Sequence, residues 1–188
     1  IAGEDTAFLS EQQLNRLFSI VQQGVFLFNL SMEENIRIGK PESGMEEIMA
    51  AAKKARIHDF IMSLPNGYQT LAGEAGVKFS GGQKQRTFVA RTLAQEPDLY
   101  LMDEPFAGVD VASERAIAGV LDSLRQKGKT IVIVHHDLST VRRLCTHSLL
   151  LSEGSLVSAG PLEESFTTEH LHRAYGLVDE ALDPREDE

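Results

Sequence analysis

Apolar residues recur every three or four positions in two stretches of the first half of the chain, at 45–52 and 57–61. This spacing predicts two short amphipathic helices. The capping-box sequence at 43–46 indicates where the first helix begins, and the turn residues at 65–67 end the second. A helical segment is therefore expected ahead of residue 79.

The pattern then becomes a regular alternation of strands and helices. The run at 98–102 predicts a short buried strand, the β-branched run at 130–134 predicts another strand, and a short apolar strand candidate lies at 18–21. The Gly-Gly pair at 81–82 predicts the start of a helix that continues to about 94, ahead of the strand at 98–102. Amphipathic spacing predicts a second helix at 112–127, between the two later strands. Strands that alternate with helices favour a mainly parallel sheet with right-handed crossovers.

The C-terminal part has a different pattern. Apolar runs on either side of Glu153-Gly154 predict a hairpin over 148–159, and a helix is expected over 169–175. Residues 179–188 are strongly acidic, and we expect this tail to be disordered.

Composition and charge exclude several classes of protein. The chain has 18 basic and 28 acidic residues, a formal net charge of −10 that argues against nucleic acid as the main partner. Its apolar runs are far shorter than the roughly 18 residues of a membrane helix. The single cysteine, Cys145, cannot form an internal disulfide and fits a reducing compartment. We expect one acidic, cytosolic domain.

Two carboxylates follow the strand at 98–102. Asp103 and Glu104 stand at its C-terminal end, where open α/β sheets bind their ligands. Such a pair can divide its roles, one acid holding a divalent cation while the other orients or deprotonates a water. Taken alone, the commoner interpretation is a strand that ends in two solvated acids.

A glycine-rich helix start precedes that strand, in the sequence Phe79-Ser80-Gly81-Gly82-Gln83. Glycines behind a capping serine expose backbone N–H groups and the positive end of the helix dipole to an anion. By itself the Ser-Gly-Gly sequence is a weak signal, since it also fits a loop that merely starts a helix.

Two histidines follow the strand at 130–134. His135 and His136 stand at the strand end that faces the same crevice as Asp103 and Glu104. Because side chains alternate along an extended segment, we expect at most one of the two histidines to belong to the site. Metal ligation by the histidines is not favoured, since no suitably spaced histidine pair or second cysteine completes a ligand set.

Taken together and in this order, these motifs resemble the nucleotide-binding domain of ABC transporters over about residues 1–176. Residues 79–83 stand where the family has its Leu-Ser-Gly-Gly-Gln signature, with Phe79 in place of leucine. The other matches are the Walker B strand at 99–104, the D-loop at 107–110, the switch histidine at His136 and the Q-loop at 21–28 with 34–36. The resemblance implies an α/β fold of the P-loop NTPase type, with a mainly parallel sheet and a C-terminal β-hairpin. It implies one partial nucleotide-binding domain over 1–178, with a helical subdomain at about 30–95.

The resemblance also implies ATP and Mg²⁺ as cofactors and a role for each matching residue. Asp103 would hold Mg²⁺, Glu104 would polarise the attacking water and His136 would contact the γ-phosphate. Gln23, with Gln22 as a near alternative, would touch the metal and the water. ATP held by a second, facing domain would be bound by residues of the signature and the D-loop, namely Ser80, Gly81, Gly82, Gln83 and Asp110.

The phosphate-binding loop of the family has no counterpart in this sequence. No Gly-x-x-x-x-Gly-Lys-Ser/Thr occurs, and Gly128-Lys129-Thr130 fails because Ser123 stands where the upstream glycine is required. We therefore expect a C-terminal part of the domain that lacks the N-terminal strands and, alone, neither binds nor hydrolyses ATP. The resemblance places the phosphate-loop strand beside 99–102, so this strand is expected to lack a neighbour and the chain to self-associate.

The predicted function is ATP hydrolysis that powers transport. The domain would act as a head-to-tail dimer with a membrane-spanning partner, at the cytoplasmic face of the cell membrane. The N-terminal half, with 27–28 and 65–68, resembles exporters with fused membrane domains. The C-terminal half, with 92–98, 106–110 and 135–138, is more similar to manganese or zinc importer ATPases.

Two other functions are open to this sequence. A non-transport ABC ATPase of DNA repair or translation is disfavoured by the short stretch between Gln23 and Ser80 and by the net negative charge. A non-catalytic half-domain that supplies only its signature loop to another chain fits the absence of a phosphate loop.

Overall fold

The structure is a computed structural model of the 188-residue chain. It describes residues 7, 9–10, 13–14, 17–22, 24–76, 78–107 and 109–176. The chain divides into two compact units, Ile1–His136 and Asp137–Glu188. The predicted tail at 179–188 lies outside the described residues.

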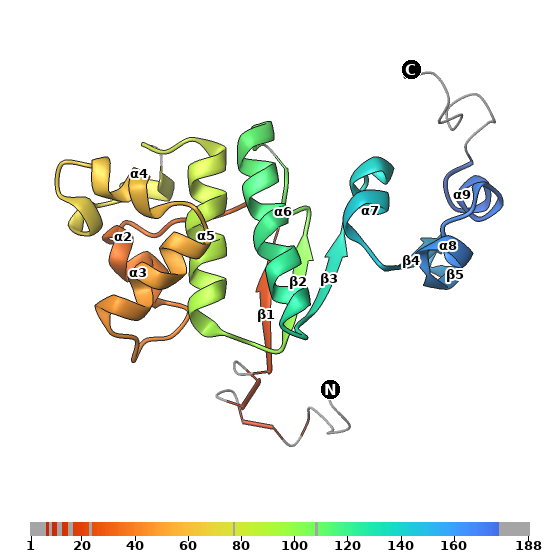
Figure 1. The fold of residues 1–188 in the computed structure, drawn as a ribbon, viewed down its shortest axis with the longest axis horizontal. Coiled ribbons are helices and arrows are strands. Elements are labelled where there is room, and N and C mark those ends of the chain that lie inside the picture. Colours follow the sequence, from red (N-terminus) through yellow and green to blue (C-terminus); the bar gives the residue numbers. More distant parts are fainter. Residues whose placement is uncertain are drawn as a thin grey trace. The chain divides into compact units, whose positions relative to one another are not determined.

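A three-stranded parallel sheet forms the centre of the first unit, in the order β1–β2–β3 (Figure 1). The strands are β1 (Phe18–Val21), β2 (Leu99–Asp103) and β3 (Thr130–Val134). The expectation that the strand at 99–102 lacks a neighbour is wrong, because β1 and β3 pair with β2 on either side. Among the described residues, the free edges of the sheet are therefore those of β1 and β3.

Two long helices, α5 (Gly81–Gln95) and α6 (Val111–Gln126), pack against the sheet. Alternation along the strands buries Val21, Tyr100 and Met102. The other face carries Ile20 and Val132, which are 47% and 48% exposed among the described residues. Both helices were predicted, α5 from the glycine pair that opens it and α6 from its apolar spacing, and their bounds agree with the prediction to within a residue.

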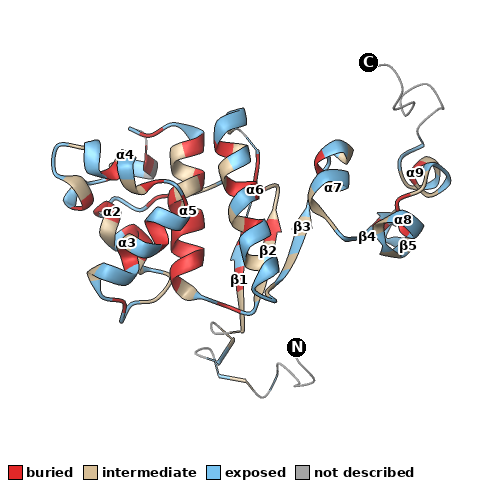
Figure 2. Cartoon of the chain, in the orientation of Figure 1, coloured by how far each residue is buried: buried red, intermediate tan, exposed pale blue. Residues whose placement is uncertain are grey.

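The segment between β1 and α5 is helical, as predicted. It contains α2 (Met32–Arg37), α3 (Met45–Lys54), α4 (His58–Ser63) and the short turns η2 (Gly67–Gln69) and η3 (Glu74–Gly76). Figure 2 shows that buried residues gather along α5 and on the parts of α2 and α3 that face it. These three helices contact one another, and each contributes a fully buried residue, Ile36, Ile48 and Val89, at most 1% exposed.

The capping box of α3 differs from the prediction by one residue. Gly44 is the N-cap, and its N–H donates to the Glu47 carboxylate at 2.9 Å. The Ser43 hydroxyl is buried without a hydrogen-bond partner within the described part of the chain. A capping box in which both side chains take part lies at Ser31 and Glu34, at the start of α2.

A buried polar contact ties α2 to α5. The Asn35 side chain accepts from the N–H of Phe28 at 2.9 Å and donates to the Phe28 carbonyl at 3.0 Å. Arg91, 8% exposed, donates to the backbone and side-chain oxygens of Asn35 at 2.7 and 3.1 Å. Burial lowers the pKa of Arg91 to about 10. This contact fixes the position of the helix that begins at Gly81.

The second unit is a hairpin covered by helices. It contains α7 (Leu138–Leu144), β4 (His147–Ser152), β5 (Ser155–Pro161), α8 (Leu162–Ser165) and α9 (Thr168–Tyr175). β4 and β5 pair antiparallel, which confirms the predicted hairpin. Its core is built on Leu150, Phe166 and Leu171, each at most 6% exposed. None of the helices described is long and apolar enough to cross a bilayer.

Candidate functional site

The parallel register of β2 and β3 brings two predicted motifs together. Asp103, the last residue of β2, stands opposite Val134, the last residue of β3, so the residues that follow them are neighbours. The N–H of Glu104 donates to the Val134 carbonyl at 2.9 Å and holds the two strand ends together. The backbone of Glu104 is left-handed, with φ 47°, a conformation that costs a residue with a Cβ about 1 kcal/mol or more.

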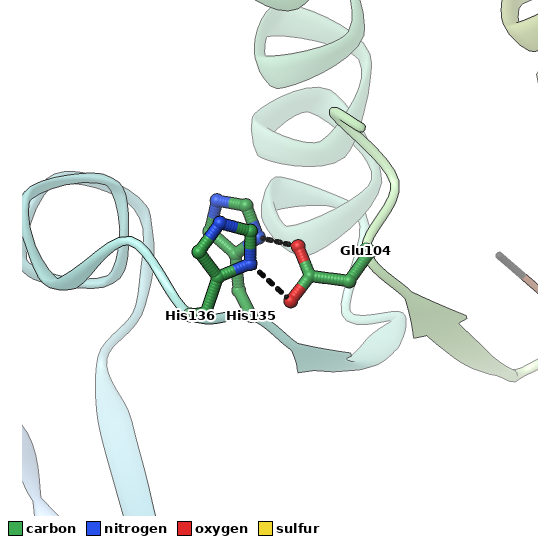
Figure 3. A group of neighbouring side chains, drawn as sticks. All are labelled: Glu104, His135 and His136. Carbon is green, nitrogen blue, oxygen red and sulfur yellow. Dashed lines mark hydrogen bonds and ion pairs between the residues drawn. The ribbon is translucent and has the colours of Figure 1, made fainter. Parts of the chain in front are cut away.

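The Glu104 carboxylate is held by both histidines (Figure 3). Its two oxygens lie 2.6 Å from Nδ1 of His135 and 2.7 Å from Nδ1 of His136. The side chains of Glu104 and His135 are 12% and 7% exposed, whereas that of His136 is 80% exposed. The His135 ring also packs edge-on against Phe106, with ring centroids 5.5 Å apart. We call Glu104, His135 and His136 the strand-end cluster.

The expectation that at most one histidine belongs to the site is wrong. It assumed that the extended alternation continues past the strand, but β3 ends at Val134 and the chain bends at His136. Both rings therefore turn toward the same carboxylate. Burial acts to raise the pKa of Glu104, but hydrogen bonds and positive charge from His136 and His135 outweigh it and hold the pKa below its ordinary value.

Asp103 precedes this cluster on the strand. Within the described part of the chain, no hydrogen bond or ion pair engages its half-buried carboxylate. An unengaged carboxylate at the carboxyl end of a parallel strand fits the oxygen ligands that Mg²⁺ prefers. Gln23, the other predicted metal contact, lies outside the described residues.

The predicted anion site at the start of α5 has the expected local structure. Ser80 is the exposed N-cap, and its hydroxyl accepts from the N–H of Gln83 at 3.3 Å. The Gln83 side chain returns to accept from the N–H of Ser80 at 2.9 Å. Among the described residues, the N–H group of the exposed Gly81 has no partner and remains open to an anion at the positive end of a 15-residue helix, whereas Gly82 is buried.

Asp110 caps α6 and meets this helix start. Its carboxylate accepts from the N–H of Ser113 at 2.9 Å and from the Ser113 hydroxyl at 2.8 Å, and these bonds lower the pKa of Asp110. A Cβ on Gly82 would lie 2.6 Å from the Ser113 hydroxyl and 3.0 Å from the Asp110 carboxylate. We call Ser80–Gln83 with Asp110 and Ser113 the helix-start cluster.

The structure thus sorts the predicted residues into two clusters, and it adds two residues that the sequence reasoning missed. His135 was excluded because side chains were assumed to go on alternating past the strand. The end of the β-branched run at Val134 was a signal that the strand stops before the histidines. Ser113 was not considered, and its place three residues after the N-cap Asp110 was the available signal.

Comparisons with known proteins agree with this geometry. The profile of the family described as ABC transporter matches residues 1–107. The chain is 41% identical over 167 residues to YgaD of Bacillus subtilis (strain 168), whose name describes a multidrug export ATP-binding/permease protein. P-glycoprotein 14 of Caenorhabditis elegans is 40% identical over 164 residues. A solved bacterial Atm1-family ABC exporter with ATP bound superposes with a TM-score of 0.81 at 34% identity, over 96% of this chain and 32% of that chain.

These likenesses assign the fold to the nucleotide-binding domains of ABC exporters, and the predicted α/β fold class is confirmed. The chain belongs to the ABC transporter family. The alignments cover 87% of this chain but only 28% of YgaD and 12% of P-glycoprotein 14. The likeness of the C-terminal half to importer ATPases stays a prediction.

Proposed function

We propose that this chain is part of an ATP-hydrolysing domain that powers transport across a membrane, in the manner of an exporter. The observation that carries the proposal is the arrangement of Glu104. This residue directly follows β2 with a left-handed backbone, and its carboxylate is bonded by two histidines. Strained backbone conformations persist where the surrounding structure enforces them, and they are concentrated at functional sites. Family membership supplies the reaction class.

The strand-end cluster would activate and position the attacking water. Glu104 has a lowered pKa, so it is ionised at neutral pH and can accept a hydrogen bond from water. His136, with 80% of its side chain exposed, would leave the carboxylate and contact the γ-phosphate. Asp103 and Gln23 would hold Mg²⁺, which when bound offsets the negative charge of the phosphates.

The helix-start cluster would bind an ATP molecule other than the one hydrolysed at the strand-end cluster. The open N–H group of Gly81, with Gly82 and the side chains of Ser80 and Gln83, would contact the phosphates of ATP held by a second domain. Asp110 would complete this contact across a head-to-tail dimer. The partners would be a second nucleotide-binding domain and a membrane-spanning domain, with hydrolysis at the cytoplasmic face of the membrane.

The decisive test is Glu104→Gln in the intact protein, with Glu153→Gln as a matched control in the β4–β5 turn. We expect the first variant to bind ATP normally and to hydrolyse it about 10²–10⁴-fold more slowly. The control should retain full activity. Hydrolysis at the normal rate by Glu104→Gln would contradict the proposal.

A further inference from the structure

We infer that Glu104, His135 and His136 form a binding site for a divalent transition-metal ion, for which Zn²⁺ is the best match. An ion bound there would occupy the carboxylate that the proposed function assigns to water activation. Only the effect of the ion on water activation rests on the proposed function. The binding of the metal rests on the side chains themselves, and it reverses the expectation that the histidines are poor candidates for ligation.

The three side chains converge closely enough to share one ion. Each offers one ligand atom, and these atoms lie within 4.8 Å of one another. Zinc binds imidazole nitrogen and carboxylate oxygen at about 2.0–2.2 Å in tetrahedral geometry, so its ligand atoms lie about 3.4 Å apart. The present Nδ1 to carboxylate distances are 2.6 and 2.7 Å, and side-chain shifts of less than about 1 Å would admit the ion. Figure 3 shows both rings directed at the same carboxylate.

The ligands are also held in place before any ion arrives. The backbone of Glu104 is fixed to Val134 by a hydrogen bond of 2.9 Å. The His135 ring is 7% exposed and packs against Phe106, which is itself buried. Because little conformational freedom is lost on binding, these two ligands favour a specific site over loose association at surface histidines.

The donor set selects the class of metal. Two imidazole nitrogens and one carboxylate oxygen suit Zn²⁺, Ni²⁺, Cu²⁺ or Co²⁺, whereas Mg²⁺ prefers oxygen ligands alone. The exposed ring of His136 provides access from solvent and leaves room for a water as the fourth ligand. Within the described part of the chain, this is the one group of three or more His, Cys, Asp and Glu side chains arranged in this way.

The test is titration of the untagged chain with ZnCl₂, by calorimetry and by competition with a chromogenic zinc indicator. We expect a single Zn²⁺ per chain and no displacement by a hundredfold excess of MgCl₂. His135→Gln should weaken Zn²⁺ binding at least about tenfold, since even changes around a metal ligand commonly cost that much. His147→Gln is the matched control, because the His147 ring is exposed and bonds to Thr146 in the other unit. X-ray absorption should show nitrogen and oxygen ligands at about 2.0–2.1 Å with imidazole scattering.

Zn²⁺ affinity that His135→Gln leaves unchanged, or that His147→Gln abolishes, would overturn the inference. If His135→Gln does not fold, His136→Gln provides the same test, because its ring is 80% exposed and contributes little to packing. In the intact protein, Zn²⁺ should reduce hydrolysis by the wild type to a far smaller fraction of its own metal-free rate than it does for His135→Gln, whatever the metal-free rate of that variant. If Glu104→Gln abolishes Zn²⁺ binding but hydrolysis persists, the metal site stands and the catalytic proposal fails.

Discussion

Gly82 approaches Ser113 so closely that a Cβ at residue 82 would lie 2.6 Å from the Ser113 hydroxyl. The two residues belong to different helix starts, those of α5 and α6, and are far apart in the sequence. The contact gives the buried Gly82 a structural role in the packing of these two helix starts. It also couples the cap of α6, through Asp110 and Ser113, to the proposed phosphate-binding helix start.

The first prediction follows from this contact. Gly82→Ala should lower the free energy of unfolding by about 1–3 kcal/mol, because the added methyl group must displace the Ser113 hydroxyl. Urea denaturation followed by circular dichroism measures the change. Combining the substitution with Ser113→Ala should recover part of the loss, and strictly additive effects of the two substitutions would contradict the contact.

Gly119 provides the matched control for that experiment. It also lies in a helix, α6, but a Cβ there would meet nothing within 4 Å. Gly119→Ala should raise the free energy of unfolding by about 0.5–1 kcal/mol, because alanine loses less backbone entropy than glycine in a helix.

The second prediction concerns the contact between α2 and α5. Asn35→Ala should lower the free energy of unfolding by about 2–4 kcal/mol, because the Phe28 N–H and Arg91 lose buried hydrogen-bond partners together. Thermal and urea denaturation measure the loss. Asn66→Ala, at an exposed position, should change stability by less than about 0.5 kcal/mol. Equal effects of the two substitutions would show that the Asn35 network is not needed.

The third prediction concerns the turn between β4 and β5. Glu153 and Gly154 both have left-handed backbones, with φ of 48° and 75°, and asparagine is favoured over glutamate at the first of these positions. Glu153→Asn should therefore stabilise the hairpin by about 0.5–1 kcal/mol. Amide hydrogen exchange of β4 and β5 measures the gain. Faster exchange in the variant would contradict this account of the turn.

The fourth prediction is a pH dependence of the second unit. Hydrogen bonds from Thr140 and Ser139 lower the pKa of Asp137, the N-cap of α7, from its ordinary 3.8 to about 2. A pKa that is lower in the folded state contributes stability above the unfolded value of about 4, and this contribution is lost as pH falls toward 2. Urea denaturation at pH 2 to 5 should show a steeper loss in the wild type than in Asp137→Asn. Equal slopes would contradict the role of this cap.

Much of the fold could be predicted because its signals are local. Apolar spacing predicted α6, and apolar runs on either side of a turn predicted the hairpin, since burying one face of each element requires such a pattern whatever the partner. The start of α5 was likewise readable, because Ser80 and Gln83 satisfy each other within one helical turn. The α2 helix was not predicted, although the box formed by Ser31 and Glu34 was present in the sequence.

The sequence by itself predicted which residues would carry the chemistry, namely Asp103, Glu104, His136 and the glycines of the signature. Only the tertiary structure decided that His135 also holds Glu104, that β2 has neighbours on both sides and that Gly82 meets Ser113. Each of these contacts depends on where one strand or helix ends relative to another. The elements are far apart in the sequence, so the spacing of apolar residues within each one does not predict the contact. Register between parallel strands and the bend after Val134 fix those positions, because they place side chains from distant parts of the chain at one edge of the sheet.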